Sequence, residues 1–225
     1  MYSIFLSKIE KVIDKIKDDI KPLIKNNAKV VILPWTFPVE INSNLLKTDF
    51  FKKGSNRYNR YIDSLKKLGI NEESIVIADC YSDSKEKLKD LINNADILIL
   101  PGGNPEMFYG KVVQECEILY EIKYFKGIII GESAGAVLQL KRYFITAKNN
   151  YYKYFAFYDG FGVINDPFYL DVHTINNQLY YNKLQTIANT YKKTVYGIFD
   201  DGALIYNRSK KEVKIVGNVK TFKSK

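Results

Sequence analysis

The chain has few of the residues on which several protein classes depend. Only two cysteines, Cys80 and Cys116, occur among its 225 residues, so we expect no disulfide framework and take a reducing cytoplasm as the default location. The longest apolar runs are only strand-length, which argues against a membrane-spanning helix. The N-terminus also lacks the basic segment, apolar run and cleavage site of a secretory signal. We therefore expect a cytoplasmic protein with no membrane partner.

Arginine is scarce although the chain is basic. The formal net charge is +9, from 34 lysines and arginines against 25 acidic residues, yet only four of the basic residues are arginines. The lysines are spread along the whole chain, and no basic stripe interleaved with aromatic residues marks a nucleic-acid surface. The sequence also lacks a spaced cluster of His, Cys, Asp or Glu that would indicate a metal site. We expect no nucleic-acid partner, no metal and no cofactor.

Hydrophobic periodicity predicts alternating helices and strands over the first 140 residues. Helices are predicted over 8–26, with a break at Pro22, and over 58–68, 84–93 and 105–124. Strands are predicted over 28–33, 74–78, 96–100 and 127–130. Such alternation indicates a parallel sheet with helices on both faces, here in a single domain spanning residues 1–225. Short strands over 143–146, 168–172, 194–199, 203–206 and 213–216 predict a mixed or antiparallel extension.

The most informative segment is residues 127–136, Gly-Ile-Ile-Ile-Gly-Glu-Ser-Ala-Gly-Ala. An apolar strand leads directly into Gly131-Glu132-Ser133-Ala134-Gly135, the G-x-S-x-G pattern of a nucleophile elbow. In this motif the serine lies on a tight strand-to-helix turn, and the helix N-terminus directs backbone N–H groups at a developing anion. Ser133 is therefore our candidate nucleophile.

A serine nucleophile needs a base, and His173 is the only histidine in the chain. The imidazole in turn needs an acid that fixes its tautomer and stabilises its cation. Asp200 and Asp201 follow the predicted strand 194–199 and are the best candidates, with Asp200 preferred. Asp171 is too close to His173 on the same strand to reach round the ring easily, although it and Glu132 remain alternatives.

Residues 101–105, Pro-Gly-Gly-Asn-Pro, lie at the end of another predicted strand. An acyl-transfer site needs backbone N–H donors aimed at the oxyanion, and small residues allow close approach of the backbone to a substrate. We expect the N–H groups of Gly103 and Ala134 to form this oxyanion hole. Asn104 and Glu132 flank the two segments and are our candidates for substrate binding.

The segments 101–105 and 127–136 together resemble the dipeptidase E and cyanophycinase family of serine peptidases, within the class I glutamine amidotransferase-like superfamily. Asp171-Val172-His173 is similar to that family's Asp-x-His segment, and residues 196–204 are similar to its segment with the triad acid. The resemblance covers roughly residues 28–207. It implies a triad in the chain order Ser133, His173, Asp200.

The chain departs from the family pattern in three respects, one of which is Thr174 after His173, where an aromatic residue is common in the family. The family acid at the position of Asp200 is commonly glutamate, which is one methylene longer. The arginines that bind acidic substrate side chains in some members are missing between residues 143 and 207, where only Lys183 or the neighbouring Arg142 could substitute. An aspartyl preference is therefore not expected.

These observations predict a flavodoxin-like three-layer sandwich and a serine-type hydrolase. The expected reaction is cleavage of an amide bond in a small peptide through an acyl-enzyme on Ser133, as in exopeptidases or dipeptidases. The alternatives are a non-peptidase esterase or amidase of the same superfamily, and a catalytically inactive binding protein on this scaffold. Assembly into a homodimer is left open.

Overall fold

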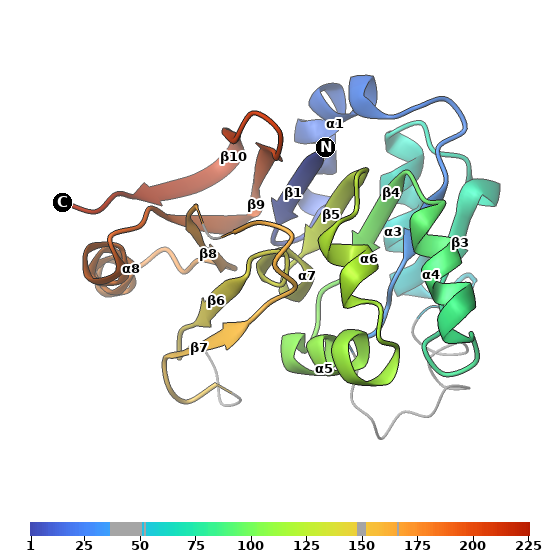
Figure 1. Cartoon of the computed structure of the whole chain (residues 1–225). Helices are drawn as coiled ribbons and strands as arrows, with labels where there is room; N and C mark the ends of the chain where they lie inside the picture. Colours follow the sequence, from blue (N-terminus) through green and yellow to red (C-terminus); the bar gives the residue numbers. More distant parts are fainter. Residues whose placement is uncertain (37–50, 52, 148–151, 166) are drawn as a thin grey trace.

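The centre of the protein is an eight-stranded, mostly parallel sheet (Figure 1). The computed structural model describes residues 1–36, 51, 53–147, 152–165 and 167–225. The strand order is β10-β9-β1-β5-β4-β2-β3, and β8 pairs with β9 beside this path. The parallel strands are β1 (Tyr2–Leu6), β2 (Val30–Ile32), β3 (Ile75–Ile77), β4 (Ile97–Leu100) and β5 (Ile128–Glu132).

The C-terminal strands extend the sheet beyond β1. Strand β9 (Val195–Asn207) runs antiparallel to β1 and pairs on its other side with β10 (Glu212–Phe222). Strand β8 (Tyr169–Val172) is parallel to the first part of β9. A separate hairpin is formed by β6 (Arg142–Ile145) and β7 (Ala156–Asp159). The predicted mixed extension is therefore present.

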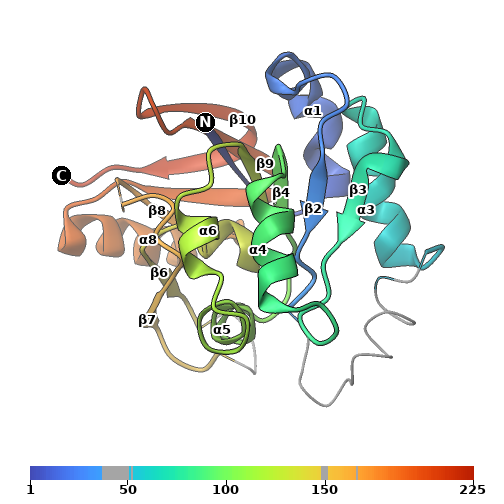
Figure 2. The ribbon, with the colours of Figure 1, turned by 45° about the vertical axis from the view of Figure 1, so that its right-hand side comes forward.

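Helices cover both faces of the sheet (Figures 1 and 2). One face carries α1 (Ile9–Ile20) and α3 (Asn56–Lys67), and the other carries α4 (Lys85–Asn93), α5 (Pro105–Gly110) and α6 (Leu119–Lys123). Strand β1 shows the two-sided burial: Ile4 and Leu6 pack in the core of the α1 side, while Phe5 packs in the core of the α4 side. This alternation follows from the two-residue period of a strand, and the flavodoxin-like fold class is confirmed.

Several elements differ from the sequence-based expectation. Strand β1 and helix α8 (Gln178–Tyr191) were not predicted. Residues 194–199 and 203–206 belong to one continuous strand, β9. The helix expected over 105–124 is interrupted by a π-helical turn at Lys111–Glu115, and Glu117 then adopts a left-handed φ of 54°. The break at Pro22 is confirmed, because α1 ends at Ile20 and a short 3-10 turn follows. Among the described residues, no helix has the length and apolar character needed to span a bilayer.

The residues around the candidate site follow the carboxyl ends of four neighbouring strands. Strands β1, β2, β4 and β5 are parallel neighbours, so their carboxyl ends meet at one edge of the sheet. Ser7 and Lys8 follow β1, Thr36 lies shortly after β2, Gly102 follows β4, and Ser133 follows β5. Ligands of open α/β sheets bind at this edge.

Candidate active site

Ser133 lies on a strained turn between β5 and the short helix α7 (Ala134–Val137). Its backbone has φ 51° and ψ −108°, outside the regions that non-glycine residues usually occupy. The Ser133 N–H donates to the Leu6 carbonyl at 2.8 Å, which ties the turn to the end of β1. Strained backbone of this kind persists where the surroundings enforce it, and it occurs often at functional sites.

The flanking glycines are required by close packing. A Cβ on Gly135 would lie 1.9 Å from the carbonyl oxygen of Leu100 in β4, and a Cβ on Gly131 would lie 2.2 Å from the carbonyl oxygen of Gly135. Both contacts are with backbone, which cannot move aside as a flexible side chain could. No residue larger than glycine therefore fits this turn without a shift of the sheet.

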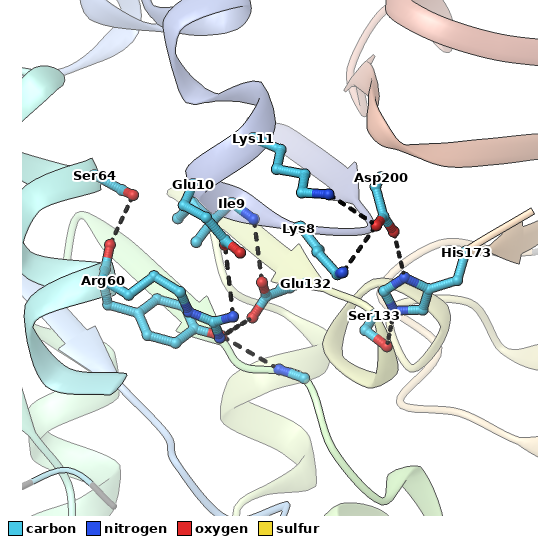
Figure 3. Close-up of polar contacts among 12 residues, drawn as sticks. Lys8, Ile9, Glu10, Lys11, Arg60, Ser64, Glu132, Ser133, His173 and Asp200 are labelled. Atoms are coloured by element: carbon cyan, nitrogen blue, oxygen red, sulfur yellow. Dashed lines mark hydrogen bonds and ion pairs between the residues drawn. The ribbon is translucent and has the colours of Figure 1, made fainter. Parts of the chain in front are cut away.

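The structure brings Ser133, His173 and Asp200 together in one chain of contacts (Figure 3). His173 Nε2 lies 2.9 Å from Ser133 Oγ, and His173 Nδ1 lies 2.8 Å from Asp200 Oδ1. The three residues come from the end of β5, the end of β8 and the middle of β9. When Nδ1 carries the proton and donates it to the carboxylate, Nε2 is the acceptor for the serine hydroxyl.

Asp200 rather than Asp201 faces the imidazole. Asp201 Oδ2 instead binds Lys15 Nζ at 2.7 Å. Asp200 Oδ2 lies 2.8 Å from Lys8 Nζ and 3.4 Å from Lys11 Nζ. Burial raises the pKa of Asp200, but the hydrogen bonds from Lys8 and His173 outweigh it and hold the pKa below its usual value. The carboxylate is therefore ionised at neutral pH.

The backbone of His173 is also fixed by the fold. His173 has a left-handed φ of 53°, and its N–H donates to Ser7 Oγ at 2.9 Å. Ser7 in turn donates to the Ile198 carbonyl at 2.9 Å, so β1 and β9 hold the loop after β8. Asp171 is buried and accepts hydrogen bonds from Thr174 Oγ1 and Tyr180 OH, both at 2.7 Å. Its carboxylate is thus engaged in the loop and helix behind His173.

A cavity of about 180 Å³ opens next to Ser133. Gly103 and Ala134 line it together with Ser133 and His173, so the expected oxyanion donors border the same space as the reacting side chains. The remaining lining is mostly apolar. It comprises Pro105, Val137, Phe144, Ile145, Thr146, Tyr152, Leu170, Asp171 and Val172.

Residues 50–214 match the model of peptidase family S51. The chain belongs to this family. The match spans more than half of the sequence and includes Ser133, His173 and Asp200, and it confirms the resemblance to dipeptidase E. Family S51 supports peptidase activity for the chain. A search of curated proteins gives no match.

Two solved structures share the fold. A proposed peptidase E protein from Listeria monocytogenes EGD-e superposes with a TM-score of 0.63 at 20% identity, over 95% of this chain and 96% of that one. A peptidase from an acI-B1 Actinobacterium superposes with a TM-score of 0.56 at 12% identity, over 99% of this chain and 94% of that one. At these identities the likeness shows the fold alone.

The two candidate substrate-binding side chains make contacts within the protein. Asn104 Oδ1 accepts from the Met107 N–H at 3.1 Å and caps α5. Glu132 is 3% exposed, and its carboxylate accepts from the Ile9 N–H and from Arg60. Neither side chain is among the described residues that line the cavity, so direct substrate contact by Asn104 or Glu132 stays a prediction.

Sequence reasoning missed four residues around the candidate site: Ser7, Lys8, Thr36 and Tyr61. Lys8 binds Asp200 across 192 positions of sequence, and no spacing rule connects a lysine before α1 with a carboxylate in β9. Lys183 and Arg142, the potential substitutes for the missing arginines, are not among the described lining residues of the cavity.

Proposed function

We propose that the protein is a serine-type peptidase that cleaves an amide bond in small peptides through an acyl-enzyme on Ser133. The observation that carries this proposal is the continuous contact from Ser133 Oγ through both ring nitrogens of His173 to Asp200, at 2.9 and 2.8 Å. Membership of family S51 supports the peptidase class. Both distances lie within hydrogen-bond reach, which general base catalysis requires.

In the acylation step, His173 Nε2 accepts the proton of Ser133 Oγ as the oxygen attacks the carbonyl carbon of the substrate. The Nδ1–H of the resulting imidazolium donates to Asp200, whose negative charge stabilises it. The carbonyl oxygen becomes an oxyanion and accepts from the N–H groups of Gly103 and Ala134. His173 Nε2 then protonates the leaving amine, the C–N bond breaks, and an ester to Ser133 remains.

In the deacylation step, water takes the place of the released amine. His173 Nε2 accepts a proton from this water, the hydroxide oxygen attacks the ester carbon, and the same two N–H groups stabilise the second oxyanion. Collapse of this intermediate breaks the bond to Ser133 Oγ, which regains its proton from His173. The carboxylic acid product leaves and the enzyme returns to its starting state.

The cavity lining favours substrates without an acidic side chain at the cleaved residue. Among the described lining residues the only titratable groups other than tyrosine are Asp171 and His173, and none is Lys or Arg. A carboxylate side chain would meet a negative group and apolar walls with no cation to pair with, which is unfavourable. We therefore propose preference for apolar or neutral residues, in exopeptidase-type cleavage.

The proposal is tested with a dipeptide panel and matched esters, assayed for wild type and Ser133→Ala. Loss of the nucleophile should lower kcat by at least about 10³-fold. Ser209→Ala changes an exposed serine outside the site and is the matched control, expected at wild-type activity. Cleavage of esters without peptides would favour the esterase alternative, and full activity of Ser133→Ala would refute Ser133 as nucleophile.

A further inference from the structure

The peptide unit between Gly102 and Gly103 is held by its carbonyl group. Thr36 Oγ1 donates to the Gly102 carbonyl at 2.7 Å, and Thr36 is only 1% exposed. The bond is trans, so its C=O and N–H point in opposite directions. A carbonyl held toward Thr36 therefore turns the Gly103 N–H away from Thr36, and Gly103 lines the cavity beside Ser133.

The preceding peptide unit, between Pro101 and Gly102, is held by its N–H group. The Gly102 N–H donates to Tyr61 OH at 3.4 Å, and Tyr61 OH itself donates to Glu132 Oε2. Burial and the charge of Glu132 hold the pKa of Tyr61 well above its usual value, so the hydroxyl stays protonated. Glu132 Oε1 also accepts the Ile9 N–H at 3.1 Å, and Oε2 accepts Arg60 Nη2 at 3.0 Å.

This bracing matters because two successive glycines have unusual backbone freedom. Gly103 has φ 146°, and a Cβ added to it would lie 2.5 Å from Thr36 Oγ1. A side chain at position 103 therefore cannot stiffen the turn. A Cβ on Gly102 would lie 3.1 Å from Ser133 Cβ, which shows how close this turn is to the nucleophile. The fixed conformation of this glycine turn must therefore come from hydrogen bonds to neighbouring residues.

We propose that Thr36 and Tyr61 are positioning residues that hold the Gly102–Gly103 peptide as a preorganised oxyanion donor. The inference rests on the serine peptidase mechanism proposed above. Glu132 supports Tyr61 from the residue directly before Ser133, so one buried carboxylate links the nucleophile strand to the donor turn. Preorganised donors lower the barrier because they need no reorientation as the oxyanion forms.

The test uses substitutions that remove single hydroxyl groups. Complete loss of an oxyanion donor costs about 10²- to 10³-fold in kcat; here the donor remains but its orientation loosens. We therefore expect Thr36→Val and Tyr61→Phe each to lower kcat about 10- to 100-fold, with KM changed by less than about twofold. Thr36→Ser keeps the hydroxyl and should restore most of kcat.

Tyr58→Phe provides the matched control. Tyr58 is on the same helix and also donates its hydroxyl to a glutamate, Glu72, at 2.8 Å, but it is not part of this network. We expect wild-type kcat for this variant. Equal loss of kcat in Tyr58→Phe would overturn the inference, because the effect would then be general to the helix.

A peptide aldehyde separates positioning from general damage. It forms a hemiacetal with Ser133 whose oxygen occupies the oxyanion position, so its Ki should rise in Thr36→Val and Tyr61→Phe by the same factor as kcat/KM falls. Wild-type kcat and Ki in both variants would overturn this inference alone. Absence of hydrolysis and of aldehyde inhibition in the wild type would instead refute the proposed function. If Thr36→Val does not fold, Tyr61→Phe decides the question.

Discussion

Replacing Asp200 by asparagine should damage the triad in a way that depends on Lys8. Three donors converge on the Asp200 carboxylate: His173 Nδ1 lies 2.8 Å from Oδ1, and Lys8 Nζ and Lys11 Nζ lie 2.8 and 3.4 Å from Oδ2. An asparagine amide offers one acceptor oxygen and one donor NH₂ group. At least one of these contacts must therefore place the NH₂ donor of asparagine opposite another donor.

Both orientations of the asparagine are unfavourable. If its oxygen faces Lys8, its NH₂ group faces His173 and selects the tautomer with the proton on Nε2, which cannot accept from Ser133. If its oxygen faces His173, its NH₂ group faces the Lys8 ammonium. Lys8 is 37% exposed on its side chain, so solvent screening reduces that clash to about 1 kcal/mol. Neither orientation supplies the negative charge that stabilises the imidazolium.

We therefore expect Asp200→Asn to lower kcat by roughly 10³-fold or more. Lys8→Met removes the nearer of the two lysines, so the asparagine oxygen can turn toward His173 at lower cost. Asp200→Asn with Lys8→Met should therefore recover about fivefold of the lost kcat, the factor that about 1 kcal/mol represents. Asp201→Asn is the matched control, since Asp201 binds Lys15 instead of the imidazole, and it should stay within about twofold of wild type.

The assay is steady-state hydrolysis of the best dipeptide by the four proteins, with circular dichroism to confirm folding. A further loss of activity when Lys8→Met is added to Asp200→Asn would refute the tautomer argument. Damage by Asp201→Asn but not by Asp200→Asn would show that the acid is misassigned.

Three further predictions concern stability. Gly135→Ala would place a Cβ 1.9 Å from the Leu100 carbonyl oxygen and should lower the free energy of unfolding by about 3 kcal/mol, measured by urea denaturation. In contrast, Gly110 has helical backbone, and a Cβ added there would meet one atom of the described residues outside its own helix backbone within 4 Å, Gln114 Oε1 at 3.9 Å. Gly110→Ala should therefore stabilise by roughly 0.5 to 1 kcal/mol; destabilisation there would contradict the packing argument. Because the folded-state pKa of Asp200 lies below its usual 3.8, its contribution to stability is present above about pH 4 and is lost as pH falls through the lowered folded-state pKa. The stability difference between wild type and Asp200→Asn should therefore shrink as the pH falls below about 4, and a difference that grows over that range would contradict the lowered pKa of Asp200.

The sequence predicted the parallel core well, because strands β2 to β5 are strongly apolar segments that alternate with periodic helices. Strand β1 was missed, although it lies between β5 and β9 in the sheet. Its five residues stand directly before a helical pattern, and only long-range pairing with β5 and β9 identifies them as a strand. Local pattern carries no information about such pairing.

Strand β9 was divided in two for a related reason. Asp200-Asp201-Gly202 has the composition of a turn, yet the strand continues through it. Lysines of the α1 region neutralise both aspartates, Lys8 and Lys11 at Asp200 and Lys15 at Asp201. This compensation comes from tertiary contacts and has no signature in the residues of the strand itself.

The candidate catalytic residues could be predicted from the sequence. The neighbouring residues that hold them in place could not. Ser133 stands in a recognisable motif, and His173 is the only histidine. The choice between Asp200 and Asp201 needed the tertiary contacts, because only these distinguish the carboxylate beside His173 from the one beside Lys15. Thr36 and Tyr61 come from elements distant in sequence and carry no motif.

Ser133 is proposed to form a covalent acyl-enzyme with the help of His173. The most direct measurement is treatment of wild type, Ser133→Ala and His173→Ala with a fluorophosphonate probe, followed by mass spectrometry of the intact and digested protein. Wild type should carry one adduct per chain, on the peptide containing Ser133. Ser133→Ala should carry none, and labelling of His173→Ala should be slowed by roughly 10³-fold or more. An adduct on another residue, or labelling of His173→Ala at the wild-type rate, would contradict the proposed roles of Ser133 and His173.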